Sequence, residues 1–169
     1  EKLVSFPTVS NRSNLELIGW VENYLNSFQI ETYRKYNEDK SKASLFAHVG
    51  PQIEGGVVLS GHTDVVPVEG QDWDTNPWTL IEKNNKLYGR GSCDMKGFDA
   101  LAIWAMVEGH KSNLKRPLQI ALSYDEEVGC LGVGPLIDTM KNNICPPELV
   151  VVGEPTDLKI INQHKSCHT

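Results

Sequence analysis

Three short runs of apolar residues constrain the fold of this chain more than any other feature. They are GVVLS at 56–60, LQIALSY at 118–124 and ELVVVG at 148–153. Continuous apolar runs of this length are typical of parallel strands that are buried on both faces of a sheet. Because segments with helical patterns separate them, we predict an α/β fold, with a mostly parallel sheet between two helical layers in a three-layer α/β/α arrangement.

Three segments carry the helical patterns. SNLE at 13–16 fits a capping box, with Ser13 as the cap and Glu16 reaching back, and apolar residues then recur at helical spacing up to residue 28. KGFDALAIWAMVEGH at 96–110 is apolar on nearly every side, which predicts a helix buried between other elements. A third helix is expected over 132–142.

Shorter strands are expected outside the three apolar runs, near 30–35 and at 44–49. The stretch LIEKNNKLYG at 80–89 predicts a hairpin that turns at Asn84 and Asn85, because asparagine tolerates the left-handed backbone that tight hairpin turns require.

Charge and hydropathy limit the classes of partner. The chain has 169 residues with 16 Lys+Arg against 22 Asp+Glu, a formal net charge of -6. This balance argues against a nucleic-acid surface and favours small-molecule or protein partners. The longest strongly apolar stretch, ALAIWAMV at 100–107, is far shorter than the roughly 20 residues of a membrane-spanning helix. We therefore expect neither a nucleic-acid nor a membrane partner.

The cysteines are widely and irregularly spaced and include no C-x-x-C pair. They are Cys93, Cys130, Cys145 and Cys167. This spacing supports neither a zinc ribbon nor a thioredoxin-type motif. The first residues, EKLVSFPTVS, also lack the layout of a secretory signal. We therefore expect reduced thiols and a cytoplasmic location.

Polar side chains that can bind a metal follow each of the three apolar runs. They are His62 and Asp64 after the first run, Asp125, Glu126 and Glu127 after the second, and Glu154 after the third. The carboxyl ends of parallel strands meet at one edge of a sheet, where such folds bind ligands. Asp94 lies just before the helix expected at 96–110, which should begin at the same edge. The sequence therefore predicts one cluster of a histidine and several carboxylates.

A cluster of this composition requires a compensating charge, since carboxylates in close contact do not all stay ionised without one. A divalent cation supplies that charge. Histidine combined with carboxylate oxygens suits zinc or a similar first-row ion better than magnesium or calcium, which prefer oxygen ligands alone. Asp64, two residues beyond His62, is well placed to accept the other imidazole N–H and so fix the tautomer.

Each motif also has an ordinary structural interpretation. An H-x-D tripeptide is common by chance, DEE at 125–127 is usually a solvated acidic turn, and GEPT at 153–156 is an ordinary proline-bent loop. Asp94 is equally suited to cap the following helix. Only the joint placement of these motifs at strand ends favours a metal site.

The four motifs together resemble those of a known family. SGHTDVVP at 60–67, GRGSCDMKG at 89–97, SYDEEVGC at 123–130 and GEPT at 153–156 occur in the order and approximate spacing of the M20 metallopeptidases, a family of dinuclear zinc aminoacylases and carboxypeptidases. The resemblance runs from LVSFPTVS near the start to HK near the end. It implies the catalytic-domain fold of a zinc-dependent exopeptidase.

The resemblance also implies a role for each site residue. His62 and Glu154 would bind one metal ion, Glu127 would bind the second, and Asp94 would bridge both. Two divalent ions, zinc or cobalt, would thus be held by His62, Asp94, Glu127 and Glu154. Glu126 would be the general base, and Asp64 would orient His62.

Within the family the motifs are most similar to those of acetylornithine deacetylases. This similarity implies hydrolysis of an N-acylated amino acid, N2-acetyl-L-ornithine to L-ornithine plus acetate in arginine biosynthesis. Succinyl-diaminopimelate desuccinylase, or another N-acyl-amino-acid amidohydrolase, is the alternative within the family, because the metal ligands do not distinguish the acyl group. The full-length protein would be a homodimer.

The resemblance further implies that residues 1–169 are the N-terminal part of the catalytic domain. The lid domain, with an oxyanion-stabilising histidine, and the C-terminal part, with the last metal-ligand histidine, would lie beyond residue 169. His164 and His168 are not expected to replace them, and His48 and His110 are expected to be ordinary strand and helix-end residues. An inactive truncated fragment that binds metal or serves as an interaction partner is therefore an alternative.

A dinucleotide-binding module is a further alternative, suggested by alternating strands and helices and by GCLGVG at 129–134. That stretch lacks the G-x-G-x-x-G order, and the acidic triplet before it would repel a pyrophosphate. We therefore favour the metal site over the dinucleotide site.

Overall fold

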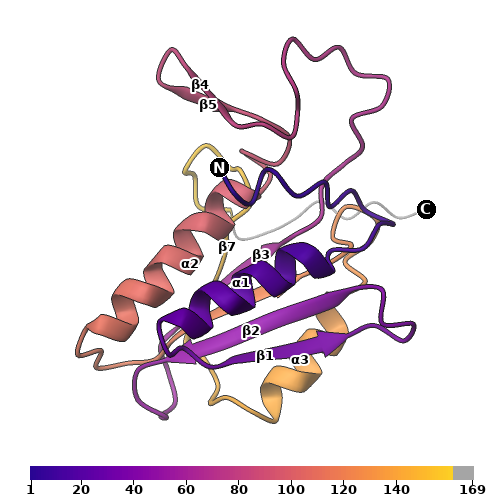
Figure 1. Cartoon of the computed structure of the whole chain (residues 1–169). Coiled ribbons are helices and arrows are strands. Elements are labelled where there is room, and N and C mark those ends of the chain that lie inside the picture. Colours follow the sequence, from indigo (N-terminus) through magenta and orange to yellow (C-terminus); the bar gives the residue numbers. More distant parts are fainter. Residues whose placement is uncertain (162–169) are drawn as a thin grey trace.

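The computed structural model describes residues 1–161, which form one mixed five-stranded sheet between helices (Figure 1). The strands of this sheet, in spatial order, are β1 (Thr32–Tyr36), β2 (Ala43–Val49), β6 (Leu118–Ser123), β3 (Val57–His62) and β7 (Leu149–Val152). The helices are α1 (Leu15–Ser27), α2 (Lys96–Lys111) and α3 (Val133–Lys141). The predicted α/β fold class and its helix-covered sheet are confirmed.

Strand direction divides the sheet into two halves. β3 pairs in parallel with both β6 and β7, as the three apolar runs predicted. β1 and β2 are antiparallel to each other, and β2 is antiparallel to β6, so the expectation of a mostly parallel sheet holds only for the half that contains β6, β3 and β7. The connection between β1 and β2 is too short for a parallel crossover, which requires a dozen or more residues, so this pair forms a hairpin.

The two faces of the sheet are covered unequally. Helices α1 and α2 pack on one face, where most of the buried apolar residues form a single cluster around Leu17, Val21, Leu45, Met106 and Ile120. Helix α3 lies on the opposite face, as Figure 1 shows, over a smaller cluster. The three predicted layers are therefore present, with the larger core on the α1 and α2 side.

Helix α2 differs from the prediction that it is buried on all sides. Its residues Ala102, Ile103 and Met106 are buried in the main cluster. Leu101 and Trp104 point away from that cluster and are 64% and 60% exposed. The helix packs on the sheet and on α1 through one side only, so the apolar residues on its other side stay exposed.

The turn at Asn84 and Asn85 forms as predicted. It joins β4 (Ile81–Lys83) to β5 (Lys86–Tyr88), and both asparagines adopt left-handed backbone angles, with φ of 53° and 56°. Two positive φ values in succession are the signature of a type I′ hairpin turn. This small second sheet projects from one end of the molecule in Figure 1.

The predicted capping box at the start of α1 is wrong. Asn14, rather than Ser13, occupies the cap position, and Ser13 Oγ accepts only the Leu15 amide, at 3.3 Å. The side chain of Asn14 bonds instead to both backbone groups of Ala43 and to Thr63 Oγ1. Tertiary hydrogen bonds therefore fix this end of the helix. Within residues 1–161, none of the helices has the length and hydropathy needed to cross a membrane.

Candidate metal centre

The predicted site residues converge on one imidazole. His62 ends β3 and is almost fully buried, at 1% exposure. Its Nε2 atom lies 3.2 Å from Oδ1 of Asp94, 3.5 Å from Oε1 of Glu154 and 3.8 Å from Oε2 of Glu126. The three carboxylates come from the segment before α2, the loop after β7 and the loop after β6. The predicted convergence at the carboxyl edge of the parallel strands is present in the structure.

Two overlapping groups of side chains could each hold a metal ion. One consists of His62, Glu126 and Glu154, and the other of His62, Asp94 and Glu127. Within each group the potential ligand atoms lie within 4.8 Å of one another. All four predicted ligands are thus brought together, and Glu126, the predicted base, lies among them. The division into a first and a second metal ion, with Asp94 as the bridge, stays a prediction.

A main-chain oxygen and a side-chain oxygen of Asp64 both face Nδ1, the other ring nitrogen of His62. Nδ1 lies 3.0 Å from the main-chain oxygen of Asp64 and 3.4 Å from its Oδ1. These acceptors favour a proton on Nδ1, which leaves the Nε2 lone pair of the neutral imidazole directed at the carboxylates. The sequence did not predict the contact with the main-chain oxygen of Asp64. Like the predicted carboxylate, this oxygen favours a proton on Nδ1 of His62.

Asp64 also connects the histidine to the acidic loop. Its Oδ1 accepts the Glu126 amide at 3.0 Å, and its Oδ2 accepts the Glu127 amide at 3.3 Å and the Ser10 hydroxyl at 2.6 Å. Burial by itself would raise the pKa of Asp64, but the hydrogen bonds from His62, Ser10 and the Glu126 amide lower it below its usual value. Asp64 is therefore an ionised buried carboxylate that fixes three segments of the chain.

The carboxylates control the charge of His62. Burial by itself would lower the pKa of His62, but the hydrogen bond and charge of Asp64, together with the charges of Glu154 and Glu126, raise it to about 9. Burial and neighbouring carboxylates, Asp94 above all, raise the pKa of Glu127. Burial and the charges of Asp94 and Glu126 likewise raise the pKa of Glu154, although His62 lowers it. The site therefore carries excess negative charge.

The residues present fit a divalent cation. A cation would relieve the repulsion that raises the pKa values of Glu127 and Glu154. One imidazole with carboxylate oxygens is a donor set suited to zinc. The structure thus offers both the charge and the ligand types that the sequence predicted.

The structure reveals further residues around the site that the sequence did not indicate. Ser10 reaches Asp64 because residues 8–10 run beside the loop after β3, with a bridge between Val9 and Val65. Lys42 forms a buried ion pair with Asp125. No local spacing relates these partners, so only the tertiary structure identifies them.

Two further buried polar residues, Asp99 and Lys96, lie beneath the site on α2. Asp99 is 1% exposed, and neither of its oxygens has a hydrogen-bond partner among the described residues. Burial raises its pKa well above the usual value. Lys96 donates to the Phe6 main-chain oxygen at 2.6 Å, and burial lowers its pKa to about 8. Aspartate is almost never fully buried unless it is paired, so Asp99 is an unusual feature of this helix.

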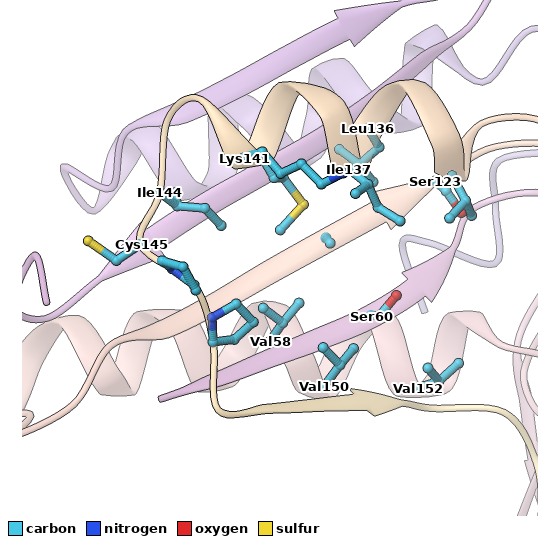
Figure 2. A pocket seen from close by; sticks show the side chains of 15 residues that line it. Val58, Ser60, Ser123, Leu136, Ile137, Lys141, Ile144, Cys145, Val150 and Val152 are labelled. Carbon is cyan, nitrogen blue, oxygen red and sulfur yellow. The ribbon is translucent and has the colours of Figure 1, made fainter. Parts of the chain in front are cut away.

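A large cavity is separate from the metal cluster. It measures about 630 Å³ and lies between α3 and the face of β3 and β7, as Figure 2 shows. Its wall is almost entirely apolar, with Val58, Leu136, Ile137, Val150 and Val152 among its residues. Among the described residues that line it there is none of the predicted metal ligands. The predicted metal ligands therefore lie at the strand ends, outside the wall of this cavity.

Among residues 1–161, neither His48 nor His110 belongs to the two ligand groups, and Cys130 contacts the cluster through a hydrogen bond of 3.6 Å from its Sγ to Glu126 Oε1. His48 lies on β2, with Nε2 3.3 Å from the Gly50 oxygen, and His110 lies in the last turn of α2. Cys93, Cys130 and Cys145 are free thiols, in agreement with the expected reduced state. His164, His168 and Cys167 lie outside the described residues.

Comparison with known proteins identifies a family and its relatives. The model of Peptidase family M20/M25/M40 matches residues 58–164. Acetylornithine deacetylase of Buchnera aphidicola subsp. Schizaphis graminum is 34% identical over 171 residues, which cover 98% of this chain and 44% of the relative. Acetylornithine deacetylase of Pasteurella multocida is 37% identical over 170 residues, which cover 96% of this chain and 44% of the relative. The chain thus spans less than half the length of these curated relatives.

A solved structure has the same fold. The M20 family metallo-carboxypeptidase Sso-CP2 from Sulfolobus solfataricus superposes with a TM-score of 0.77 over 90% of this chain and 35% of that protein, at 17% sequence identity. At this identity the similarity concerns the fold alone.

Proposed function

The chain belongs to Peptidase family M20/M25/M40, and we propose that it is the N-terminal part of the catalytic domain of a metal-dependent amidohydrolase. The observation that carries this proposal is the environment of His62, whose Nε2 faces carboxylate oxygens from three separate segments. In this proposal the lid domain and the C-terminal part of the catalytic domain are not contained in residues 1–169.

We assign the metal ligands to the residues around that imidazole. Two divalent ions would be held by His62, Asp94, Glu127 and Glu154, with Asp94 as the ligand that both would share, and zinc, or else cobalt, is the ion that the donor set suits. The two overlapping groups support this assignment because together they contain all four ligands, with the ligand atoms of each group within 4.8 Å of one another, and they also place the proposed base Glu126 beside His62 and Glu154. When bound, such ions activate a water molecule and polarise the amide carbonyl that it attacks.

The chain's own residues then move and hold protons. Glu126 removes a proton from the attacking water and later delivers it to the leaving amine, the task of a general base that becomes a general acid. Its carboxylate adjoins the cluster, 3.8 Å from His62 Nε2, and its side chain is 35% exposed, so substrate can reach it. Asp64 keeps the His62 proton on Nδ1 and, through the Glu126 amide, aligns the base with the histidine.

We propose N2-acetyl-L-ornithine as the substrate, with L-ornithine and acetate as products in arginine biosynthesis. Support comes from the relatives named acetylornithine deacetylase, which are 34% and 37% identical over nearly all of this chain. In the same proposal the enzyme acts in the cytoplasm, and its full-length form is a homodimer.

Zinc binding tests the metal assignment. The metal-free protein is titrated with zinc and the bound ions are counted by native mass spectrometry, for the wild type, His62→Ala and the matched control His48→Ala. We expect the wild type and His48→Ala to bind zinc with equal stoichiometry and His62→Ala to bind at least one ion fewer. Equal binding by His62→Ala would overturn the assignment.

Release of free amine tests the substrate assignment. The zinc-loaded full-length protein is incubated with N2-acetyl-L-ornithine or with N-succinyl-LL-diaminopimelate, and kcat/KM is compared. A higher kcat/KM for the acetylated substrate is expected, whereas a higher value for the succinylated one would assign the protein to the desuccinylases.

A further inference from the structure

The loop after β6 contains three consecutive acidic residues, and the structure separates them. Glu126 and Glu127 belong to the two potential ligand groups, whereas Asp125 belongs to neither. The carboxylate of Asp125 is buried and faces Lys42, whose Nζ lies 2.6 Å from Oδ1 and 2.5 Å from Oδ2. The side chains of Lys42 and Asp125 are only 10% and 9% exposed. One residue of the acidic triplet is therefore held away from the cluster by a specific partner.

Lys42 is itself held firmly in place. It is the residue before β2, at the end of the β1–β2 hairpin. Its amide donates to Asn37 Oδ1 at 2.9 Å, and its main-chain oxygen accepts the Asn37 amide at 3.1 Å. The next residue, Ala43, is bonded through both its backbone groups to the Asn14 side chain. The ammonium group therefore extends from a backbone fixed on both sides.

The loop that receives this ammonium has an unfavourable backbone. Asp125 has a φ of 55°, in the left-handed region that residues other than glycine adopt at a cost. Such a conformation persists only where the surroundings hold it. Several contacts do so here: the Glu126 and Glu127 amides bond to Asp64, the Leu131 amide bonds to the Asp125 main-chain oxygen, and the Asp125 side chain pairs with Lys42.

We infer that Lys42 is a positioning residue of the metal centre. By pairing with Asp125 it fixes the turn at which the chain leaves β6, so that Glu126 and Glu127, rather than Asp125, face His62. The inference rests on the proposed metal function, which it extends to a residue outside the cluster. Removal of one partner from a buried ion pair leaves an unpaired buried charge, and the loop then rearranges to bring Asp125 to water or to the cluster.

Zinc affinity, measured by calorimetric titration, is the first readout. Outer residues that orient metal ligands typically change affinity by about 10–100-fold, and we expect Lys42→Met to weaken zinc binding by this amount. Lys111→Met is the matched control, because Lys111 pairs with Glu108 on the exposed side of α2. Asp125→Asn should cause a similar loss, and the double variant should show no further loss, because the two residues act as a unit.

Amide hydrogen exchange in the metal-free protein is the second readout. Lys42→Met should speed exchange of the Glu126 and Glu127 amides, on the order of tenfold or more, while the amides between β3 and β6 keep their protection. This pattern separates release of the loop from general destabilisation. A uniform rise in exchange over the sheet would assign Lys42 a merely structural role and overturn the inference.

The combined outcomes distinguish the two proposals. If the wild type binds zinc, His62→Ala binds at least one ion fewer and Lys42→Met binds zinc with unchanged affinity, the metal centre stands and the role of Lys42 is wrong. If the wild type itself binds no zinc, both proposals are wrong. Weaker binding by Lys42→Met with local exchange at Glu126 and Glu127 supports both.

Discussion

The main-chain oxygen of Asp64 lies 3.0 Å from Nδ1 of His62, closer than the 3.4 Å of the Asp64 carboxylate oxygen Oδ1. The backbone of Asp64 therefore contributes to the tautomer of the imidazole, and the carboxylate additionally bonds to Ser10 and to the acidic loop. Asp64 therefore has two functions: it orients the His62 imidazole, and it holds Ser10 and the acidic loop. Experiment can separate them, because the second depends on the side chain alone, whereas the main-chain oxygen also serves the first.

Asp64→Asn is expected to weaken zinc binding by about 10–100-fold without abolishing it. The amide removes the negative charge and disrupts the acceptor positions for the Glu126 and Glu127 amides, but the main-chain oxygen still faces Nδ1. Calorimetric titration with zinc measures the effect. Ser10→Ala, which removes a single hydrogen bond to the same carboxylate, should show a smaller loss, and a larger loss for Ser10→Ala would contradict this division of roles.

Zinc binding is expected to release a proton from His62 at neutral pH. The pKa of about 9 means that the metal-free imidazole is protonated at pH 7, whereas a ligand imidazole must be neutral. Apparent affinity should therefore rise by about tenfold per pH unit as pH increases toward 9. Calorimetry at pH 7 in buffers of different ionisation enthalpy counts the protons released. Zinc affinity that does not change between pH 6 and 8 would show that His62 is not the ligand.

Asp99→Asn is expected to stabilise the metal-free protein at pH 8. Burial raises the pKa of Asp99 above its unfolded value, so its contribution favours folding below about pH 3.9 and is lost as pH rises through the folded-state pKa. The side-chain amide in the Asp99→Asn variant does not ionise, so the variant does not lose this folding stability as pH rises. Chemical denaturation from pH 4 to 8 should show a stability gain that grows with pH, whereas the exposed control Asp138→Asn should show none. A gain that is constant with pH would mean that Asp99 does not titrate as proposed.

Gly61→Ala is expected to destabilise the protein by about 1–3 kcal/mol through overpacking. A Cβ atom at residue 61 would overlap Oδ1 of Asp99 and approach Cε of Met95 at 3.2 Å, which would push β3 and α2 apart directly below His62. Gly134→Ala in α3 is the matched control, since a Cβ there meets nothing within 4 Å and alanine favours the helix. Thermal or denaturant unfolding measures both variants. Equal stability of Gly61→Ala and wild type would show that the strand and helix adjust freely.

The sequence predicted the elements whose pattern is local. Apolar runs and helical periodicity identified β3, β6, β7 and the three helices, and the Asn84–Asn85 turn follows from backbone chemistry alone. The direction of β1 and β2 was not predictable in the same way, because an apolar pattern does not state which strand lies beside which. The exposure of Leu101 and Trp104 has the same origin, since periodicity does not state what covers each side of a helix.

The residues of the site likewise fall into those that the sequence predicted and those that it did not. Its ligand residues could be predicted because strand ends in a parallel sheet meet at one edge, so position in sequence implies position in space. Ser10 and Lys42 could not, because their partners Asp64 and Asp125 lie 54 and 83 residues away and no repeat or motif relates them. Residues that hold a site together are thus less visible in a single sequence than residues that form it.

The location of bound zinc tests the central claim most directly. Crystals of the zinc-loaded protein, measured at the zinc absorption edge, give the ion positions from anomalous scattering. We predict zinc ions in this cluster, with ligand distances of about 2.0–2.2 Å. The ligands are Nε2 of His62 and carboxylate oxygens of Asp94, Glu127 and Glu154. Zinc bound only elsewhere on the surface, with His62 Nε2 still facing the carboxylates without an ion, would contradict the assignment of this cluster as a metal centre.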